Sequence, residues 1–87
     1  MTLYFRSPDA IFSEVEGEFV ALNINKGQCY GMDSIASTVW TMIDEPRSIE
    51  EICGTLQDIY DVDSETCRSD VESLLTTLSQ EGLVGIR

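Results

Sequence analysis

Three cysteines are the residues of this chain best suited to nucleophilic or redox chemistry: Cys29, Cys53 and Cys67. A cysteine nucleophile reacts as a thiolate and usually needs an imidazole partner, but the sequence has no histidine. The cysteines are odd in number, and their spacing matches no zinc or thiol-redox motif. We therefore expect free, buried thiols of the kind found in the reducing cytoplasm, and no metal site.

Paired carboxylates are the second candidates for chemistry, because two neighbouring acids can divide the roles of acid and base. Glu50 and Glu51, and likewise Asp61 and Asp63, stand at expected helix starts and turns, where acids usually cap helices or remain solvated. The sequence therefore predicts neither an enzyme nor a cofactor. An enzyme with a cysteine nucleophile is the alternative, and fast alkylation of a single thiol would favour it.

Charge and length limit the partners of the chain. Sixteen acidic residues stand against five basic ones, a formal charge of −11, so the phosphates of a nucleic acid would be repelled. The N-terminus does not read as a signal peptide, and no apolar run approaches membrane-spanning length. We expect a cytoplasmic protein with one domain over residues 1–87 and no membrane contact.

The first part of the chain shows the alternation typical of strands. Residues 19–25 alternate most clearly and put Val20, Leu22 and Ile24 on one face, which we predict to be buried. Turn sequences at 16–18 and 25–27 separate this strand from strands at 10–16 and 28–33, giving a three-stranded antiparallel meander. Tyr30 and Met32 are predicted to continue the buried face. Residues 3–5 could add a short N-terminal strand.

After about Asp33 the apolar residues recur at helical spacing. Three helices are predicted: one from Asp33 or Ser34 to before Pro46, one that starts with a capping box at residues 48–51, and one from about residue 63 to Gly82. Residues 83–86 could pack back onto the body. The fold class is thus α+β, a three-stranded sheet followed by three helices that cover one of its faces, with helix-turn-helix geometry in the helices.

A transcriptional regulator is a competing interpretation of this geometry. In a DNA reader the exposed face of the third helix carries Arg and Lys, whereas here Arg68 is the one basic residue on an acidic helix. Salt-sensitive binding in a gel shift would revive this alternative.

The strand at 28–33 is the most promising binding surface. As the last strand of the meander it has one neighbour and leaves one row of backbone groups unpaired. Its residues 29–32 carry no charge, and Gly31 lets another backbone approach, so an extended peptide could add a strand here. The alternative is that the N-terminal arm or the third helix covers this edge.

The third helix could form the far wall of a groove beside that edge. Cys67, Val71, Leu74 and Leu78 share roughly one flank with Asp70, although Leu74 and Leu78 fit a core equally well. A carboxylate on an apolar flank can meet a backbone N–H or a cation of a guest, and can equally remain solvated.

The order and spacing of these features resemble the PqqD-like family over nearly the whole chain from about residue 10. The resemblance is carried by residues 20–33, by Ala36 to Trp40, by Ser48 to Ile52, and by a diffuse set of positions further on: Tyr60, Asp70, Val71, Leu74, Leu78, Gly82 and Leu83.

The resemblance implies a winged helix-turn-helix known as a RiPP recognition element. Such a domain binds the leader of a ribosomally made precursor peptide as a strand added to its third strand, and presents the precursor to a maturation enzyme. The chain looks like the discrete leader-binding partner of lasso-peptide clusters, which works with a leader peptidase; a chaperone for a radical enzyme is the alternative. By position, the resemblance implies these peptide-binding residues: Gln28, Cys29, Tyr30, Gly31, Met32, Asp33, Cys67, Asp70, Val71, Leu74 and Leu78.

Overall fold

Alternating side chains and two glycine-containing turns build the predicted meander in the computed structural model, which describes residues 1–87. Strand β2 (Ala10–Val15) pairs with β3 (Glu18–Asn23), and β3 pairs with β4 (Cys29–Gly31), all antiparallel. Glu16 and Gly17 both have positive φ, 53° and 84°, the backbone that a tight two-residue hairpin requires. The three-stranded antiparallel sheet is therefore confirmed.

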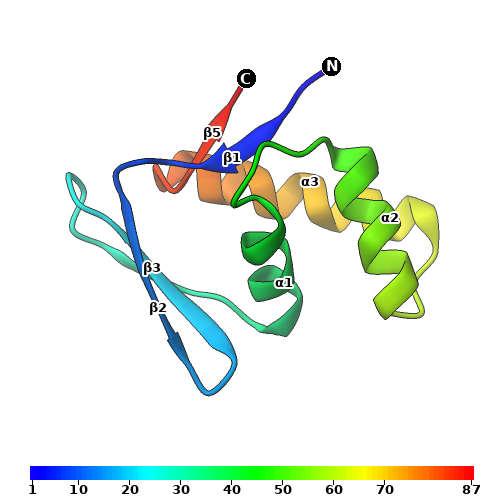
Figure 1. The fold of residues 1–87 in the computed structure, drawn as a ribbon, viewed down its shortest axis with the longest axis horizontal. Helices are drawn as coiled ribbons and strands as arrows, with labels where there is room; N and C mark the ends of the chain where they lie inside the picture. The colour runs from blue at the N-terminus through cyan, green and yellow to red at the C-terminus, as the bar shows by residue number, and fades with distance from the viewer.

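A second, two-stranded sheet joins the ends of the chain. Strand β1 (Tyr4–Arg6) pairs antiparallel with β5 (Val84–Ile86), so that the two termini lie side by side (Figure 1). The α+β class is confirmed, but the strands form sheets of three and two rather than one sheet followed by helices. The winged helix-turn-helix arrangement stays a prediction.

The three predicted helices begin at side-chain caps. Helix α1 (Ser34–Met42), α2 (Ile49–Ile59) and α3 (Ser64–Gln80) each follow a residue whose side chain accepts a hydrogen bond from the first turn. The α2 cap is a full capping box, because the Glu51 carboxylate also accepts from the Ser48 N–H at 3.0 Å. The caps are Asp33, Ser48 and Asp63.

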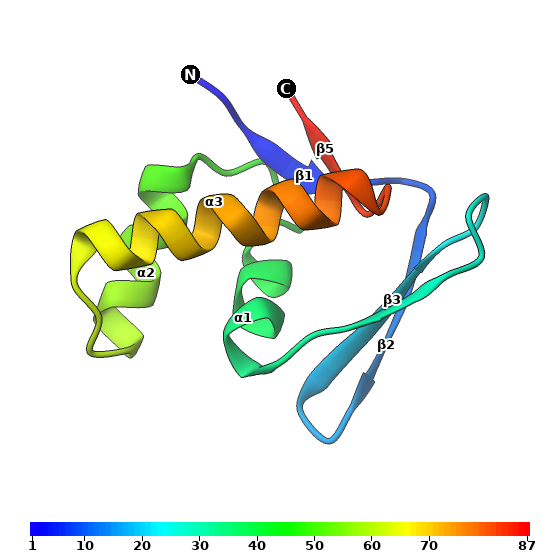
Figure 2. The same ribbon diagram turned by 180° about the vertical axis from the view of Figure 1, so that it is seen from behind.

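The core lies among the helices and β5 rather than beneath the whole sheet. Its largest fully buried side chains come from α1 and its C-cap, from α2, from α3 and from the segment that follows α3: Trp40, Ile43, Ile52, Leu75, Leu78 and Leu83. Figures 1 and 2 show the β2–β4 sheet projecting to one side of the helices, while α3 spans much of the molecule. Helix α1 makes the main helical contact with this sheet, against β3, so the expectation that the helices cover one face is met only in part.

The prediction that Val20, Leu22 and Ile24 are buried is wrong. The face of β3 that meets the core carries Ala21 and Asn23, which are 1% and 6% exposed, whereas Val20 and Ile24 are 38% and 59% exposed. The reason is that Asn23 is held inside by specific hydrogen bonds: its Nδ2 donates to the Gly82 carbonyl at 2.6 Å, and its Oδ1 accepts two backbone N–H groups of the following turn.

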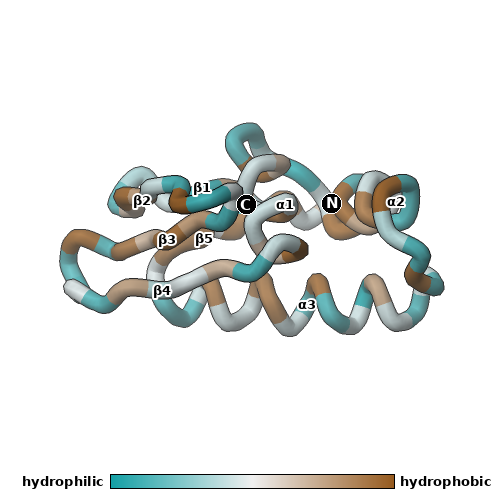
Figure 3. The backbone as a smooth tube through the Cα atoms, turned by 90° about the horizontal axis from the view of Figure 1, so that it is seen from below, coloured by the Kyte–Doolittle hydropathy of each residue, from teal (hydrophilic) through white to brown (hydrophobic).

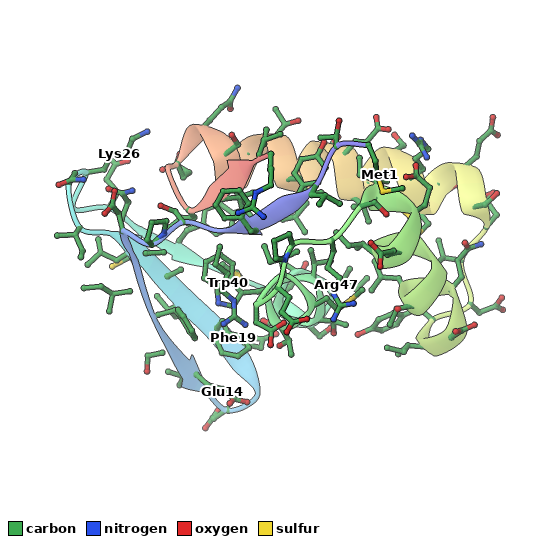
Figure 4. All side chains as sticks on the ribbon, turned by 45° about the horizontal axis from the view of Figure 1, so that its top comes forward. Met1, Glu14, Phe19, Lys26, Trp40 and Arg47 are labelled. Atoms are coloured by element: carbon green, nitrogen blue, oxygen red, sulfur yellow. The ribbon has the colours of Figure 1, made fainter.

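Aromatic side chains fill the inward face at the hairpin. Phe12 packs edge-to-face on Phe19 and on Trp40, with ring centroids 5.8 and 5.4 Å apart, and Arg6 stacks over Phe12. Figure 4 shows Phe19 and Trp40 between the hairpin and α1. Tyr30 and Met32 also face inward as predicted, because Tyr30 lies opposite Ala21 and Met32 is 3% exposed.

Candidate functional site

Strand β4 has one free edge. It pairs with β3 and with no other strand, in the register Val20–Gly31, Ala21–Tyr30 and Leu22–Cys29. The Met32 N–H donates to the Phe19 carbonyl at 2.8 Å. Because hydrogen-bonded and non-bonded pairs alternate along an antiparallel ladder, Cys29 and Gly31 direct their N–H and C=O groups to the open side. A guest main chain would find two consecutive outward-facing positions there.

A buried serine fixes the end of this edge to α1. The Ser37 hydroxyl accepts from the Phe19 N–H at 3.0 Å and donates to the Met32 carbonyl at 3.3 Å, so it bridges β3 and β4 beyond their last paired residues. Ser37 is 4% exposed. The edge is therefore held at a defined distance from the helices.

A largely apolar cavity of about 340 Å³ opens beside the edge of β4. It lies between β4, the start of α1, the end of α2 and residues 67–74 of α3. Figure 3 shows β4 as the strand of its sheet on the side toward α3. The lining residues are Tyr30, Gly31, Asp33, Ile35, Ala36, Leu56, Tyr60, Val62, Cys67, Asp70, Val71 and Leu74.

The floor and the rim of this cavity differ in exposure. Leu56, Cys67 and Val71 on the floor are buried. On the rim, Ile35 is 45% exposed, and Tyr60 is half-buried with its hydroxyl 3.3 Å from the Thr38 hydroxyl. A formed apolar recess with a polar margin is the usual form of a site that takes an apolar side chain.

Two carboxylates are the charged groups of the lining. The Asp33 Oδ1 accepts from the Ala36 N–H at 2.9 Å, so one of its oxygens serves as the cap of α1. Asp70 is exposed, and its carboxylate makes no hydrogen bond or ion pair within the chain. Asp70 is consequently the carboxylate with free capacity to bind a cation or an N–H donor of a guest.

The thiols lie partly where they were expected. Cys53 and Cys67 are buried, with the Cys67 Sγ 3.9 Å from the Cys53 carbonyl oxygen. Burial, followed by the hydrogen bond from Cys67, raises the pKa of Cys53 to about 11, which keeps it a thiol at neutral pH. The expectation that all three are buried is wrong for Cys29, which lies at the open edge strand and is exposed.

The structure brings seven of the eleven predicted site residues to the cavity: Tyr30, Gly31, Asp33, Cys67, Asp70, Val71 and Leu74. Gln28 and Cys29 are exposed outside it, while Met32 and Leu78 are core side chains with 3% and 0% exposure. A guest could reach Met32 and Leu78 only if the core opened. Contact of any of the eleven with a peptide stays a prediction.

Sequence reasoning missed the contribution of the first two helices. Ile35 and Ala36 of α1, Leu56 of α2, and Tyr60 and Val62 after α2 complete the cavity. The apolar stripe of α2, which includes Leu56 and Tyr60, was visible in the sequence, but a stripe alone does not separate a core position from a cavity wall.

Residues 18–84 match the family model described as coenzyme PQQ synthesis protein D (PqqD). This chain belongs to the PqqD family. The match spans β3, β4 and all three helices, and therefore both the free edge and the cavity.

Two solved structures share the fold of this chain. One is TbiB1 in complex with the TbiA(beta) leader peptide, whose sequence is 26% identical to this chain. The two structures match with a TM-score of 0.86, and the match covers 92% of this chain and 93% of that one. A lasso peptide synthetase B1 complexed with the leader peptide is 17% identical, with a TM-score of 0.83 over 94% and 96% of the two chains, which shows a shared fold. Among curated proteins, no sequence match was found.

Proposed function

We propose that this PqqD-family chain binds the leader segment of a ribosomally made precursor peptide as a strand added to β4. The observation that carries the proposal is the free edge of β4 directly beside an apolar cavity. Backbone pairing at Cys29 and Gly31 would supply affinity that does not depend on sequence, and alternate side chains of the guest would enter the cavity and supply specificity. The similar TbiB1, whose structure holds a leader peptide, supports this assignment.

The proposed role is recognition rather than catalysis. The chain has no histidine, and Cys53 is buried with a pKa of about 11. A thiol so protonated is a poor nucleophile at neutral pH. The bound precursor would instead be presented to a separate maturation enzyme, which we propose is the leader peptidase of a lasso-peptide pathway. The family description names coenzyme PQQ synthesis, so we propose a radical enzyme of that pathway as the second candidate.

Substitution of a cavity residue tests the proposal against a matched control. Leu74 lines the cavity and is half-buried, whereas Ser73 is exposed on the same helix outside it. Leu74→Asp and Ser73→Asp add the same charge, so a loss of leader affinity seen only for Leu74→Asp reports the contribution of the cavity to binding. We expect Leu74→Asp to weaken binding of a fluorescein-labelled cognate leader at least about tenfold in anisotropy titrations, and Ser73→Asp less than about twofold.

Tyr30→Lys provides a second variant, on the side of the cavity formed by β4, where a lysine would replace part of the apolar wall and should also weaken leader binding. Circular dichroism of each variant verifies the fold. The absence of saturable binding to the leader encoded beside the chain, or equal affinities for Leu74→Asp and Ser73→Asp, would refute the proposed site.

A further inference from the structure

The outward face of the β2–β4 sheet is mostly apolar and uncovered, with Ser13 and Glu18 as its polar members. Cross-strand register places Ile11, Leu22 and Cys29 in one row and Ser13, Val20 and Gly31 in the next, all pointing away from the face that meets the core. Ile11, Val15, Val20 and Ile24 are 54%, 58%, 38% and 59% exposed. We call Ile11, Val15, Val20 and Leu22 the outer face, which ends next to Ile24 in the turn after β3; Figure 3 shows hydrophobic stretches on both β2 and β3.

Contiguous exposed apolar patches on small proteins generally mark interaction sites. The outer face is separate from the cavity, because none of its residues lines that recess. The two surfaces nevertheless adjoin at β4, since Gly31 lies opposite Val20 and also lines the cavity.

Charge decides what kind of partner fits. The hairpin beside Val15 carries Glu14, Glu16 and Glu18, and the whole chain has a formal charge of −11. Figure 4 shows Glu14 at the hairpin tip. A second copy would bring the same acidic rims together, and an anionic lipid surface would be repelled in the same way. The complementary surface is therefore a protein with an apolar patch flanked by Lys and Arg.

Continuity of the sheet identifies that protein. A strand added to β4 would extend the sheet by one strand, so every second side chain of the guest would lie on the same side as the outer face. A protein seated there would touch both the chain and the guest. It could thus distinguish the loaded from the empty chain, as an enzyme that acts on the guest must do.

We propose that the outer face docks the maturation enzyme, through a basic-rimmed apolar patch on that enzyme, and that the bound guest forms part of the contact. This inference rests on the proposed function. It adds a second surface, on the opposite side of the sheet from the cavity, with a different partner.

Matched lysine substitutions test the inference. Ile11→Lys and Val20→Lys place a cation on the outer face, whereas Ile59→Lys makes the same change at an isoleucine of α2 that is 58% exposed and outside the cavity. The probes are the fluorescein-labelled leader and the purified maturation enzyme encoded beside this chain. Leader affinity is measured by anisotropy, and enzyme affinity by calorimetry with the leader-loaded chain.

We expect all three variants to bind the leader within about twofold of the unmodified chain, and Ile11→Lys and Val20→Lys to bind the enzyme at least about tenfold more weakly. Ile59→Lys should bind the enzyme normally. Enzyme affinity unchanged in Ile11→Lys and Val20→Lys would overturn the docking surface alone. Failure of the unmodified chain to bind the leader would overturn the proposed function and this inference together.

Self-association gives an independent readout. Sedimentation of the unmodified chain should show a monomer. A dimer that Val20→Lys dissociates would assign the outer face to a second copy and would also overturn the inference.

Discussion

Asp70 is the residue whose chemistry most directly bears on specificity. It stands on the cavity rim, exposed and without a partner in the chain, on the wall opposite β4. Its environment differs from that of Asp33, whose Oδ1 is engaged as a helix cap. A cationic or N–H-bearing guest residue can therefore bind Asp70 without disturbing the fold.

Removal of the Asp70 charge should weaken guest binding modestly. We expect Asp70→Asn to lower leader affinity about two- to fivefold, since exposed charge pairs contribute little, and to flatten the dependence of affinity on salt. Asp58→Asn, an exposed aspartate of α2 outside the cavity, is the control. Anisotropy titrations at low and high salt measure both effects, and identical salt dependence in the two variants would contradict this role.

The thiols should divide into one accessible group and two protected ones. Iodoacetamide at neutral pH should label Cys29, which is exposed, no faster than it labels free glutathione, while Cys53 and Cys67 react only after denaturation. Faster labelling of Cys29 would favour the enzyme alternative. For Cys53, burial raises the pKa to about 11, so a rising pH up to about 9 should leave it mostly protonated. Mass spectrometry of digested protein counts the labelled sites, and rapid labelling of Cys53 in the native chain would contradict the burial.

At the scale of elements, helix caps define where each helix starts and how it orients the site. The α1 cap is itself a rim residue of the cavity, Asp33, and the α2 cap is the buried Ser48 with Glu51. These local hydrogen bonds satisfy backbone N–H groups of the first turns and stabilise the helices that line the recess.

The capping box should make stability depend on pH. The hydrogen bonds from Ser48, the backbone N–H first, lower the pKa of Glu51 below its ordinary value of 4.5. An acid whose pKa is lower in the folded than in the unfolded chain stabilises the folded chain at pH values above the unfolded pKa. That contribution is lost as the pH falls through the folded-state pKa. The difference in unfolding free energy between the unmodified chain and Glu51→Gln should therefore be largest near about pH 6 and shrink toward about pH 3.

Urea unfolding followed by circular dichroism measures this difference. Glu45→Gln, an exposed glutamate without a hydrogen bond in the chain, is the control and should show no comparable pH dependence. A difference for Glu51→Gln that stays constant down to about pH 3 would contradict the role of the charged carboxylate.

For the whole molecule, one buried side chain links the sheet to the helices. Asn23 is the last residue of β3, and its Nδ2 donates to the carbonyl of Gly82, 59 positions along the chain and just past the end of α3. Gly82 has φ of +72°, the left-handed conformation that ends many helices. The same junction therefore ends α3 and orients the β2–β4 sheet, with its free edge, against it.

Removing the Asn23 side chain should lower the free energy of unfolding more than removing the side chain of a nearby exposed asparagine. We expect Asn23→Ala to lower the free energy of unfolding by about 2–3 kcal/mol, because it removes three hydrogen bonds at a buried position. Asn25→Ala, at an exposed residue of the following turn, should change it by less than about 0.5 kcal/mol. Chemical denaturation compares them, and equal costs would contradict the assigned role of Asn23.

The sequence by itself determined the parts whose signals are local. Helix starts at Asp33, Ser48 and Asp63, the two turns of the meander and the uncharged edge strand all follow from residues within a few positions of one another. The resemblance to the PqqD-like family rested on the same patterns, and the match over residues 18–84 confirms it.

Only the tertiary structure decided which face of the sheet is covered. Alternation identifies two sets of side chains along β3 but not which set meets the helices, and the more apolar set, Val20, Leu22 and Ile24, is the uncovered one. Burial of Asn23 depends on the Gly82 carbonyl, which is distant in sequence, and the cavity depends on four elements that meet only after folding. Such long-range contacts leave no local pattern in the sequence, because the residues that meet lie far apart in the chain and their separation is not fixed.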